Sequence, residues 1–254
     1  MQVDGIHHHH DHPLASFELS TLFTELIQVT MAHSQIDPAI LYWGTPVLLI
    51  STINEDGTSN IGPMSSAFWL GDRCMLGLAK HSKTPENLFR TSQCVLNLPS
   101  DDMGAAVNAL ARTTGTKDVP ESKFGRGYRF EKDKFAIANL TPQPSETVEP
   151  PRITECPVQM EAELVGRYDA LGGAIAVVEV RILRTHVLDE LRLKGHANRI
   201  DPDAWHPMIM SFQHLYGLRA GKIANSRLAK IDEELYRLST LIKRHVPESG
   251  PEPE

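Results

Sequence analysis

Two polar segments of the sequence carry residues that suit the binding of a charged, flat ligand. The first is KHSKTPENLFR, Lys80 to Arg90, which places ammonium groups and hydroxyls just before a predicted helix that begins at Thr84 and Pro85. A helix N-terminus offers unpaired N–H groups and partial positive charge, and charged donors strengthen hydrogen bonds to an anion. The segment could bind a phosphate, or it could be a well-capped, solvated helix start. No glycine-rich phosphate loop favours the first alternative.

The second segment is SNIGPMSSAFWL, Ser59 to Leu70, in which a proline precedes two serines. Pro63 lacks an N–H donor, so it is expected at a strand edge or a bulge. A strand interrupted there leaves backbone N–H and C=O groups free, and the polar edge of a heteroaromatic ring could pair with them. An ordinary edge strand would carry the same residues.

Composition narrows the classes of function. A chain of 254 residues with 41% hydrophobic content can fold as one domain. The 25 Lys and Arg residues against 32 Asp and Glu residues give a net charge of -7, which disfavours nucleic acid and anionic membranes as partners. The three cysteines are far apart and form no C-x-x-C pair, so a reducing compartment is expected. No apolar run reaches the roughly 18 residues of a membrane span, and no signal peptide pattern begins the chain. These features predict a cytoplasmic protein.

A histidine-rich run, His7 to His12, stands near the N-terminus. Clustered imidazoles bind divalent transition metals in solution. The alternative is a flexible terminal tract, native or added for expression, without the surrounding groups that order a functional site. We assign residues 1–16 to such a flexible segment and expect no metal site.

The hydrophobic pattern predicts a mainly β fold with flanking helices. A strand over Thr45–Asn54 leads into Asp56-Gly57, a pair typical of hairpin turns. Two more strands follow through tight turns, which favours an antiparallel meander or barrel, because parallel strands need crossover helices. The other expected elements are a helix over Glu18–Ala32, strands over Ser59–Leu70, Arg73–Ala79 and Cys94–Leu98, helices over Thr84–Ser92 and Ser100–Arg112, a lid-length loop over Thr113–Arg129, an irregular run over Leu140–Pro157, and a hairpin of Val158–Tyr168 with Ala174–Leu188.

The last part of the chain predicts a helix over residues 225–246. An apolar stripe at helical spacing, which is either core or a dimer seam, is formed by Leu228, Ile231, Leu235, Leu238 and Ile242. Residues 247–254 are predicted to be a disordered tail. The expected domain therefore spans residues 17–224.

The two polar segments and their flanking strands resemble the flavin-reductase-like FMN-binding domain family. From Leu49 to Pro99 the sequence reads LISTINEDGTSNIGPMSSAFWLGDRCMLGLAKHSKTPENLFRTSQCVLNLP. In that family a strand, an acidic-Gly hairpin, an N-x-x-P-x-S strand, a K/S-x-T-x-x-N segment and a V-x-N-L strand follow in this order. The resemblance is looser through the hairpin that ends near Leu188, and it leaves the two terminal helices outside.

The resemblance implies an FMN-binding split β-barrel that forms a homodimer, with FMN near the subunit interface. Carried over by position, the residues expected to line the isoalloxazine ring and ribityl chain are Asn60, Pro63, Met64, Ser65 and Ser66. Those expected to hold the phosphate are Ser82, Lys83 and Thr84, with Asn87 bracing their loop. Thr52 is a further contact, and His81 is either a phosphate donor or a loop residue.

The implied activity is an FMN-dependent oxidoreductase of the flavin reductase type, which passes hydride from NADH or NADPH to flavin. Because the flavin performs the hydride chemistry, no nucleophile is required, and neither G-x-S-x-G nor H-E-x-x-H occurs. His214 and Tyr216 are either a general acid or packing residues. An alternative function is an FMN-binding electron carrier or sensor without fast turnover. An oxygenase or another acceptor could take the electrons.

Overall fold

The computed structural model describes residues 33–224 and 226–236. The chain divides into two units, Met1–Leu41 and Tyr42–Glu254. In the first, the described residues 33–41 form neither helix nor strand. The predicted helix over Glu18–Ala32 and the histidine-rich run lie outside the described residues.

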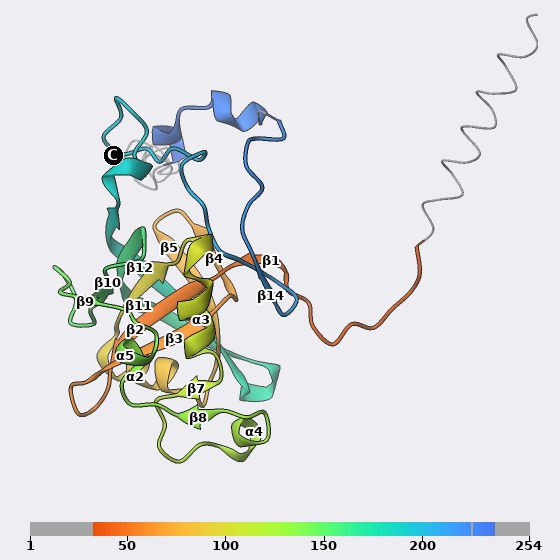
Figure 1. The fold of residues 1–254 in the computed structure, drawn as a ribbon, viewed down its shortest axis with the longest axis vertical. Coiled ribbons are helices and arrows are strands. Elements are labelled where there is room, and N and C mark those ends of the chain that lie inside the picture. The colour runs from red at the N-terminus through yellow and green to blue at the C-terminus, as the bar shows by residue number, and fades with distance from the viewer. Residues whose placement is uncertain (1–32, 225, 237–254) are drawn as a thin grey trace, which may run out of the picture. The chain divides into compact units, whose positions relative to one another are not determined.

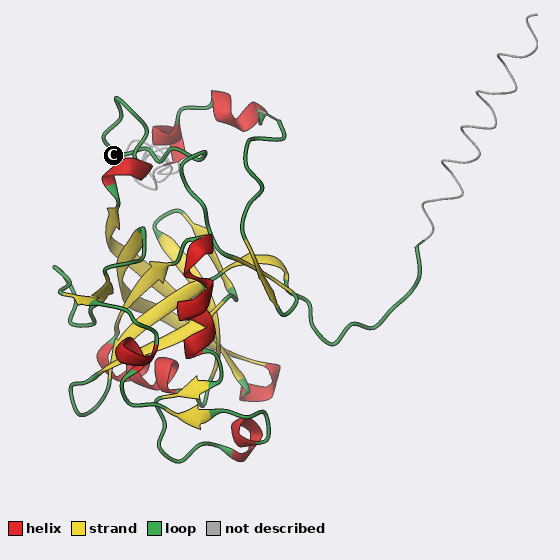
Figure 2. Cartoon of the chain, viewed as in Figure 1, coloured by secondary structure: helices red, strands yellow, loops and turns green. Residues whose placement is uncertain are grey.

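The second unit is built on a seven-stranded antiparallel sheet with the order β3-β2-β6-β11-β12-β5-β4. Figure 2 shows its strands in yellow with short helices around them. The strands are β2 (Leu48–Ile53), β3 (Ser59–Met64), β4 (Ala67–Leu70), β5 (Arg73–Ala79), β6 (Gln93–Leu98), β11 (Val158–Ala170) and β12 (Ile175–Val187). The expected mainly β class is therefore confirmed.

The sheet curls until its two edges meet at Ser65 and Ser66. We predicted one strand over Ser59–Leu70, but β3 and β4 lie at opposite edges of the sheet order. Only two residues join them, and at 3.8 Å per peptide unit the edges are at most about 11 Å apart there. The N–H of Gly77 in β5 donates to the Ser66 carbonyl at 2.8 Å. The predicted strand is therefore two strands, and its break closes the barrel.

The barrel interior is an apolar core with contributions from most of the strands. In β5, buried and half-buried residues alternate, as expected when one face of a strand is packed. The buried residues of this core are Leu48, Ile50, Ala67, Cys74, Leu76, Leu78, Leu88, Cys94, Leu96, Ala162, Ala176, Val178 and Val180. Leu88 comes from helix α2 (Lys83–Thr91), so α2 packs against the barrel core.

A second core covers the outer face of β2 and β3. Helices α3 (Gly104–Leu110) and α5 (Lys134–Ile137) contact β3 there, as Figure 1 shows. Val107, Leu110 and Phe135 pack against Leu49 and Ile61. Because both of its faces are covered, β2 is buried along most of its length.

Helix α2 begins earlier than predicted. We placed its cap at Thr84, but the structure begins the helix at Lys83 with Ser82 in extended conformation before it. Pro85 then stands third in the helix, where a missing N–H costs no intrahelical hydrogen bond. Thr84 is consequently free to face β3 instead of capping the helix.

The segments between β6 and β11 are short and irregular. The predicted helix over Ser100–Arg112 forms as the 3₁₀ turn η1 (Asp101–Met103) followed by α3. The lid-length loop holds β7 (Thr113–Thr114), paired in parallel with β8 (Arg129–Phe130), and α4 (Glu121–Phe124). The proline-rich run contains only the two-residue strands β9 (Pro142–Gln143) and β10 (Arg152–Ile153).

The predicted long hairpin is confirmed. Strands β11 and β12 have 13 residues each and are joined by the turn η2 (Leu171–Gly173), while 3₁₀ turn η3 (Asp189–Leu191) follows them. A separate small sheet pairs β1 (Trp43–Pro46), which precedes the barrel, with β13 (Ile209–Ser211), which in turn pairs with β14 (His214–Tyr216).

The predicted C-terminal helix is wrong over the part of it that the structure describes. Between residues 226 and 236 the chain forms only two 3₁₀ turns, η4 (Arg227–Lys230) and η5 (Glu233–Tyr236). Ile231 between them is extended, which breaks helical periodicity, and the predicted stripe is exposed at Leu228 and Leu235. The rest of the predicted helix, and the tail, lie outside the described residues.

Candidate functional site

A buried cluster of hydroxyls and carboxamides fixes the start of α2 to the β2–β3 hairpin. The amide nitrogen of Asn60 lies 3.3 Å from the hydroxyls of both Thr52 and Thr84. The amide nitrogen of Asn87 donates to Thr52 Oγ1 at 3.1 Å and to Asn54 Oδ1 at 2.9 Å. The structure therefore brings together Thr52, Asn60, Thr84 and Asn87, which the sequence assigned to one site.

Two glycines allow the backbone to approach this cluster closely. A Cβ on Gly62 would fall 2.2 Å from Thr84 Oγ1. A Cβ on Gly115 would lie 2.8 Å from Asn60 Oδ1 and 2.9 Å from Lys83 Cγ. Gly115 thus brings the first residues of the lid-length loop against the start of α2.

The cluster also holds two carboxamide oxygens without partners. Among the described residues, Asn60 Oδ1 and Asn87 Oδ1 are buried and accept no hydrogen bond. A buried polar atom left without a partner costs about 1–3 kcal/mol. Such oxygens would suit the hydroxyl groups of a ligand.

Lys83 is largely covered and already lies between two carboxylates. Its Nζ is 2.8 Å from Glu86 Oε1 and 3.4 Å from Glu55 Oε2, and 12% of its side chain is exposed. Burial lowers the pKa of Lys83, but the hydrogen bond and charge of Glu86, together with Glu55, raise it above its ordinary value. The ammonium is therefore positive at neutral pH, and an incoming anion would share it with Glu86 and Glu55.

The neighbours of Lys83 point in different directions. Ser82 Oγ donates to the Ala79 carbonyl at 2.6 Å, whereas Thr84 is turned into the buried cluster. His81 is exposed and has no hydrogen bond among the described residues. The three predicted phosphate residues are thus consecutive at the start of α2, but their present contacts diverge.

The crossover between β3 and β4 forms a second group of predicted residues. Pro63 lies on the edge strand β3, where it stands opposite Leu49 of β2. Met64 packs against the barrel core. Ser65 is buried, while Ser66 Oγ lies 2.9 Å from the hydroxyl of Tyr42. These four predicted residues therefore lie at the closure of the barrel, whereas Asn60 lies in the buried cluster at α2.

An open cavity of about 670 Å³ adjoins the start of α2. Its lining residues are Lys80, His81, Glu86, Phe89, Thr116, Arg167 and Asp169. Sites for small molecules commonly enclose about 300–1,000 Å³. Glu86 belongs to this lining and also pairs with Lys83, so the cavity continues from the predicted phosphate residues.

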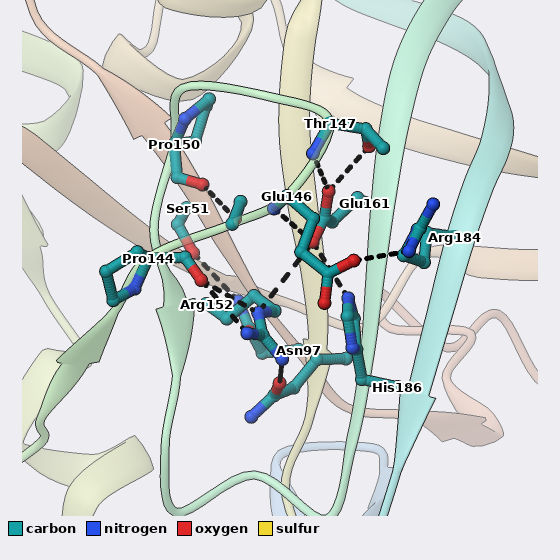
Figure 3. A network of polar contacts seen from close by, with 12 residues as sticks. Ser51, Asn97, Pro144, Glu146, Thr147, Pro150, Arg152, Glu161, Arg184 and His186 are labelled. Atoms are coloured by element: carbon teal, nitrogen blue, oxygen red, sulfur yellow. Dashed lines mark hydrogen bonds and ion pairs between the residues drawn. The ribbon is translucent and has the colours of Figure 1, made fainter.

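The outer wall of the barrel carries a separate buried polar network, shown in Figure 3. Glu161 on β11 is 0% exposed and accepts hydrogen bonds from the N–H groups of Glu146 and Thr147, at 2.9 and 2.6 Å. His186 Nε2 lies 2.8 Å from the same carboxylate, and Arg152 lies 3.8 Å from it. Burial alone would raise the pKa of Glu161, but these hydrogen bonds lower it to about 2. Glu161 thus clamps the proline-rich segment to the sheet.

Asn97 of the V-x-N-L strand belongs to this outer wall. Its amide donates to the Leu49 carbonyl at 2.9 Å and to Ser51 Oγ at 2.8 Å, and its Oδ1 accepts from the N–H of Ile153 at 2.9 Å. These contacts hold β10 against β2 and β6. Asn97 is therefore a structural residue of the motif.

A family model described as flavin reductase like domain matches residues 42–215 of this chain. The matched range contains the barrel, the cluster at α2, the crossover and the cavity. The chain belongs to the flavin reductase like domain family. It is thereby a flavin-related oxidoreductase, and the family resemblance stated from the sequence is confirmed.

Relatives of this flavin reductase like domain include one protein of substantial identity. The uncharacterized protein YdfE of Bacillus subtilis (strain 168) is 40% identical over 192 residues, which are 75% of this chain and 92% of YdfE. Flavoredoxin of Desulfovibrio vulgaris (Miyazaki F) is 19% identical with a TM-score of 0.64, over 79% of this chain and 99% of that chain. Nitrilotriacetate monooxygenase component B from Bacillus cereus is 18% identical with a TM-score of 0.60, over 77% and 100%. At such identities the solved structures show the shared split-barrel fold.

The residues of this flavin reductase like domain fit FMN in the chemistry of their polar groups. Hydroxyls and cations at the start of α2 suit a phosphate, and the partnerless oxygen of Asn60 suits a ribityl hydroxyl. The carboxylates of Glu55 and Glu86 do not suit a phosphate directly, and each is held by Lys83.

Sequence reasoning missed Tyr42, Phe89 and Arg167. Tyr42 contacts Ser66 through its hydroxyl, although the segment before the first barrel strand carried no motif. Arg167 lies over the ring of Phe89 at 4.7 Å because β11 returns past α2, a contact that local patterns do not encode. His214 and Tyr216 lie on the small sheet, exposed and outside the cavity lining.

Among the described residues, no group of three His, Cys, Asp or Glu side chains could hold a metal ion, and no helix has the length and apolar character to span a membrane.

Proposed function

We propose that this chain is an FMN-dependent oxidoreductase of the flavin reductase type, which passes hydride from NADH or NADPH to flavin. The observation that carries the proposal is that several of the predicted flavin-binding residues meet in one buried cluster inside the domain that the family model matches. The family match over residues 42–215 includes a buried cluster in which Thr52, Asn60, Thr84 and Asn87 stand at the positions that the resemblance assigned to flavin binding.

When bound, FMN would supply the hydride acceptor, so the protein's part is to bind and orient the reactants. We assign the polar edge of the ring to the crossover, where Ser65 and Ser66 offer hydroxyls and backbone groups. The Tyr42 hydroxyl at 2.9 Å from Ser66 Oγ orients that serine. Pro63 leaves the strand edge without one ladder donor, and Met64 braces the crossover from the core side.

We assign the phosphate to the start of α2. Ser82 and Lys83 would contact it from the helix start, and His81, which lines the adjacent cavity, would be a further donor. Thr84 and Asn60 stand behind them in the buried cluster.

The two fully buried members of the site have a different role in this proposal. Thr52 and Asn87 are 0% exposed and hydrogen-bonded to each other at 3.1 Å. We therefore interpret them as positioning residues that fix α2 relative to β2.

We further propose a homodimer, as the resemblance implies. The exposed apolar side chains support it, because a monomer rarely leaves large apolar side chains grouped on an edge strand. On β4, Phe68 is 60% exposed and Leu70 is 71% exposed, and Trp43 of β1 is 67% exposed. A cytoplasmic location remains part of the proposal, supported by the free and buried state of the three cysteines.

Titration of the purified protein with FMN, followed by absorption and calorimetry, tests the cofactor assignment. We expect tighter binding of FMN than of FAD, because the ligand would end at the phosphate. Equal or tighter binding of FAD would contradict the assigned phosphate position, and no flavin binding would contradict the proposed function. Oxidation of NADH or NADPH that depends on flavin then separates the enzyme from an electron carrier or sensor.

A further inference from the structure

Helix α5 places a buried ammonium against strand β3. Lys134 is 3% exposed, and its Nζ donates to the carbonyl of Ile61 at 2.7 Å. Within residues 33–224 and 226–236, Lys134 makes no other hydrogen bond, and no carboxylate lies within ion-pair distance of it. A buried charge that lacks a counter-charge is costly to a fold. An ammonium kept at this cost points to a role beyond packing.

This ammonium lies at the open edge of β3, the first strand in the sheet order. Along an antiparallel strand, the backbone groups of successive residues point alternately toward a neighbouring strand and away from it. The Leu49 carbonyl accepts a hydrogen bond from Asn97 of β6, so the backbone groups of Leu49 are directed toward β6. Pro63 stands opposite Leu49 and, without an N–H, points away from β2. Ile61, two residues earlier, points the same way, toward Lys134.

The same open edge leads to the residues that the proposed function assigns to the flavin ring. It runs from Ile61 through Pro63 into the crossover at Ser65 and Ser66. Two residues of an antiparallel strand span about 6.8 Å, which is the distance along the edge from Ile61 to Pro63. A buried charge acts over such a distance because little water screens it.

Lys134 is charged at neutral pH and has donors to spare. Burial and the charge of Lys123 lower its pKa to about 8, while the charge of Glu131 raises it. Because this pKa still lies above 7, most of the ammonium is protonated. An ammonium carries three N–H donors, and the Ile61 carbonyl uses one of them.

Hydride transfer adds one negative charge to a flavin, because the electron pair of the nicotinamide C–H bond leaves with its hydrogen and no proton accompanies it. The nicotinamide is oxidised and the flavin is reduced. Protein charges near the ring tune this exchange. We infer that Lys134 is the cation that stabilises the added negative charge, so that it favours the binding of reduced FMN over oxidised FMN. The inference rests on the proposed function.

The test uses the full chain with two neutral variants. Lys134→Met removes the charge and the donor, whereas Lys134→Gln removes the charge and keeps a donor for the Ile61 carbonyl. Lys132→Gln is the matched control, because Lys132 is exposed two residues earlier on the same segment. Anaerobic equilibrium dialysis measures the affinities for oxidised and reduced FMN, and a spectral titration against reference dyes measures the midpoint potential of bound FMN. Circular dichroism and thermal unfolding identify the folded variants.

Both neutral variants of Lys134 should weaken the binding of reduced FMN roughly 10-fold or more beyond any change for oxidised FMN. A tenfold difference in a two-electron couple corresponds to about 30 mV, so the midpoint potential of bound FMN should fall by about 30 mV or more. Lys132→Gln should match the unmodified protein. If one neutral variant does not fold, the other gives the same comparison.

The inference is overturned by an unchanged midpoint potential, by an equal loss of affinity for both forms of FMN, or by the same shift in Lys132→Gln. An effect in Lys134→Met that is absent in Lys134→Gln would also overturn it, because the hydrogen bond to Ile61 and not the charge would then matter. In each of these cases the unmodified protein would still bind and reduce flavin, so the proposed function would stand. An unmodified protein that binds no flavin would remove both.

Discussion

Replacing Lys83 with alanine is the perturbation whose size the structure defines best. We expect this ammonium to contact the FMN phosphate and not the ring. A hydrogen bond to a charged group contributes about 1.5–3 kcal/mol. The ammonium must first be shared with Glu86 and Glu55, at 2.8 and 3.4 Å, and both carboxylates are about half exposed. Exposed ion pairs contribute up to about 1 kcal/mol, so the net loss is about 0.5–2 kcal/mol when one pair is displaced.

Lys83→Ala should therefore weaken FMN binding by roughly 2- to 30-fold, less than the roughly 10- to 150-fold expected for a lysine without partners. Calorimetry at low and at raised salt measures the change, and riboflavin is the control ligand because it lacks the phosphate. Glu86→Gln should tighten FMN binding, since it removes a competitor for the same ammonium. The effect of both variants should shrink as salt rises.

An unchanged FMN affinity in Lys83→Ala, or an equal loss for riboflavin, would refute the placement of the phosphate at this helix start. The assignments of Ser82 and Thr84 to the phosphate would then fall with it. Lys80 and Arg90 would be the next candidates to test.

Three further predictions concern stability and assembly. Gly62→Ala should lower the free energy of unfolding in urea by about 1–3 kcal/mol, because the added Cβ would lie 2.2 Å from the buried Thr84 hydroxyl. The control Gly104→Ala should be neutral or stabilising, because Gly104 has helical backbone angles and no atom lies within 4 Å of its added Cβ. Since the pKa of Glu161 is lowered from 4.5 to about 2, its contribution to stability is fully present above about pH 4.5 and is lost as pH falls toward 2; acid unfolding should show up to about 3 kcal/mol of this dependence, and Glu161→Gln should remove it. Light scattering at micromolar concentration should show a dimer; Leu235→Glu then tests whether the exposed side chain of η5 joins the interface, and a monomeric unmodified protein would contradict the homodimer.

The strands were predictable because each barrel strand carries a local signal. The alternation in Arg73–Ala79 and the paired patterns of β11 and β12 reflect one packed face and do not depend on distant partners. The division of Ser59–Leu70 was not predictable in the same way. In the sequence Ser65 and Ser66 continue the strand pattern, and only the closure of the barrel, which places β3 and β4 at opposite edges of the sheet, separates the two strands.

The candidate site was predictable where the motif itself supplies the contacts. Thr52, Asn60, Thr84 and Asn87 lie on neighbouring elements of one short stretch of chain, so their order along the sequence nearly fixes their meeting. Arg167 reaches the cavity only through the return of a strand from much later in the chain. Such a contact is set by topology, and no local pattern marks it.

The C-terminal stripe shows how periodicity alone can mislead. Leu228, Ile231 and Leu235 have helical spacing, yet the described part of the chain folds them into 3₁₀ turns separated by an extended residue. Helical spacing stabilises a helix only when a packed face covers the stripe. Within the described residues these three side chains are exposed, so no packed face covers the stripe there.

The most direct test of the central claim is anaerobic stopped-flow mixing of the FMN-loaded protein with NADH and, separately, with NADPH, followed through flavin absorbance. We predict bleaching of the bound flavin within seconds with at least one of the two nicotinamides. A protein that binds FMN but shows no reduction over minutes with either one would contradict the assignment as a flavin reductase.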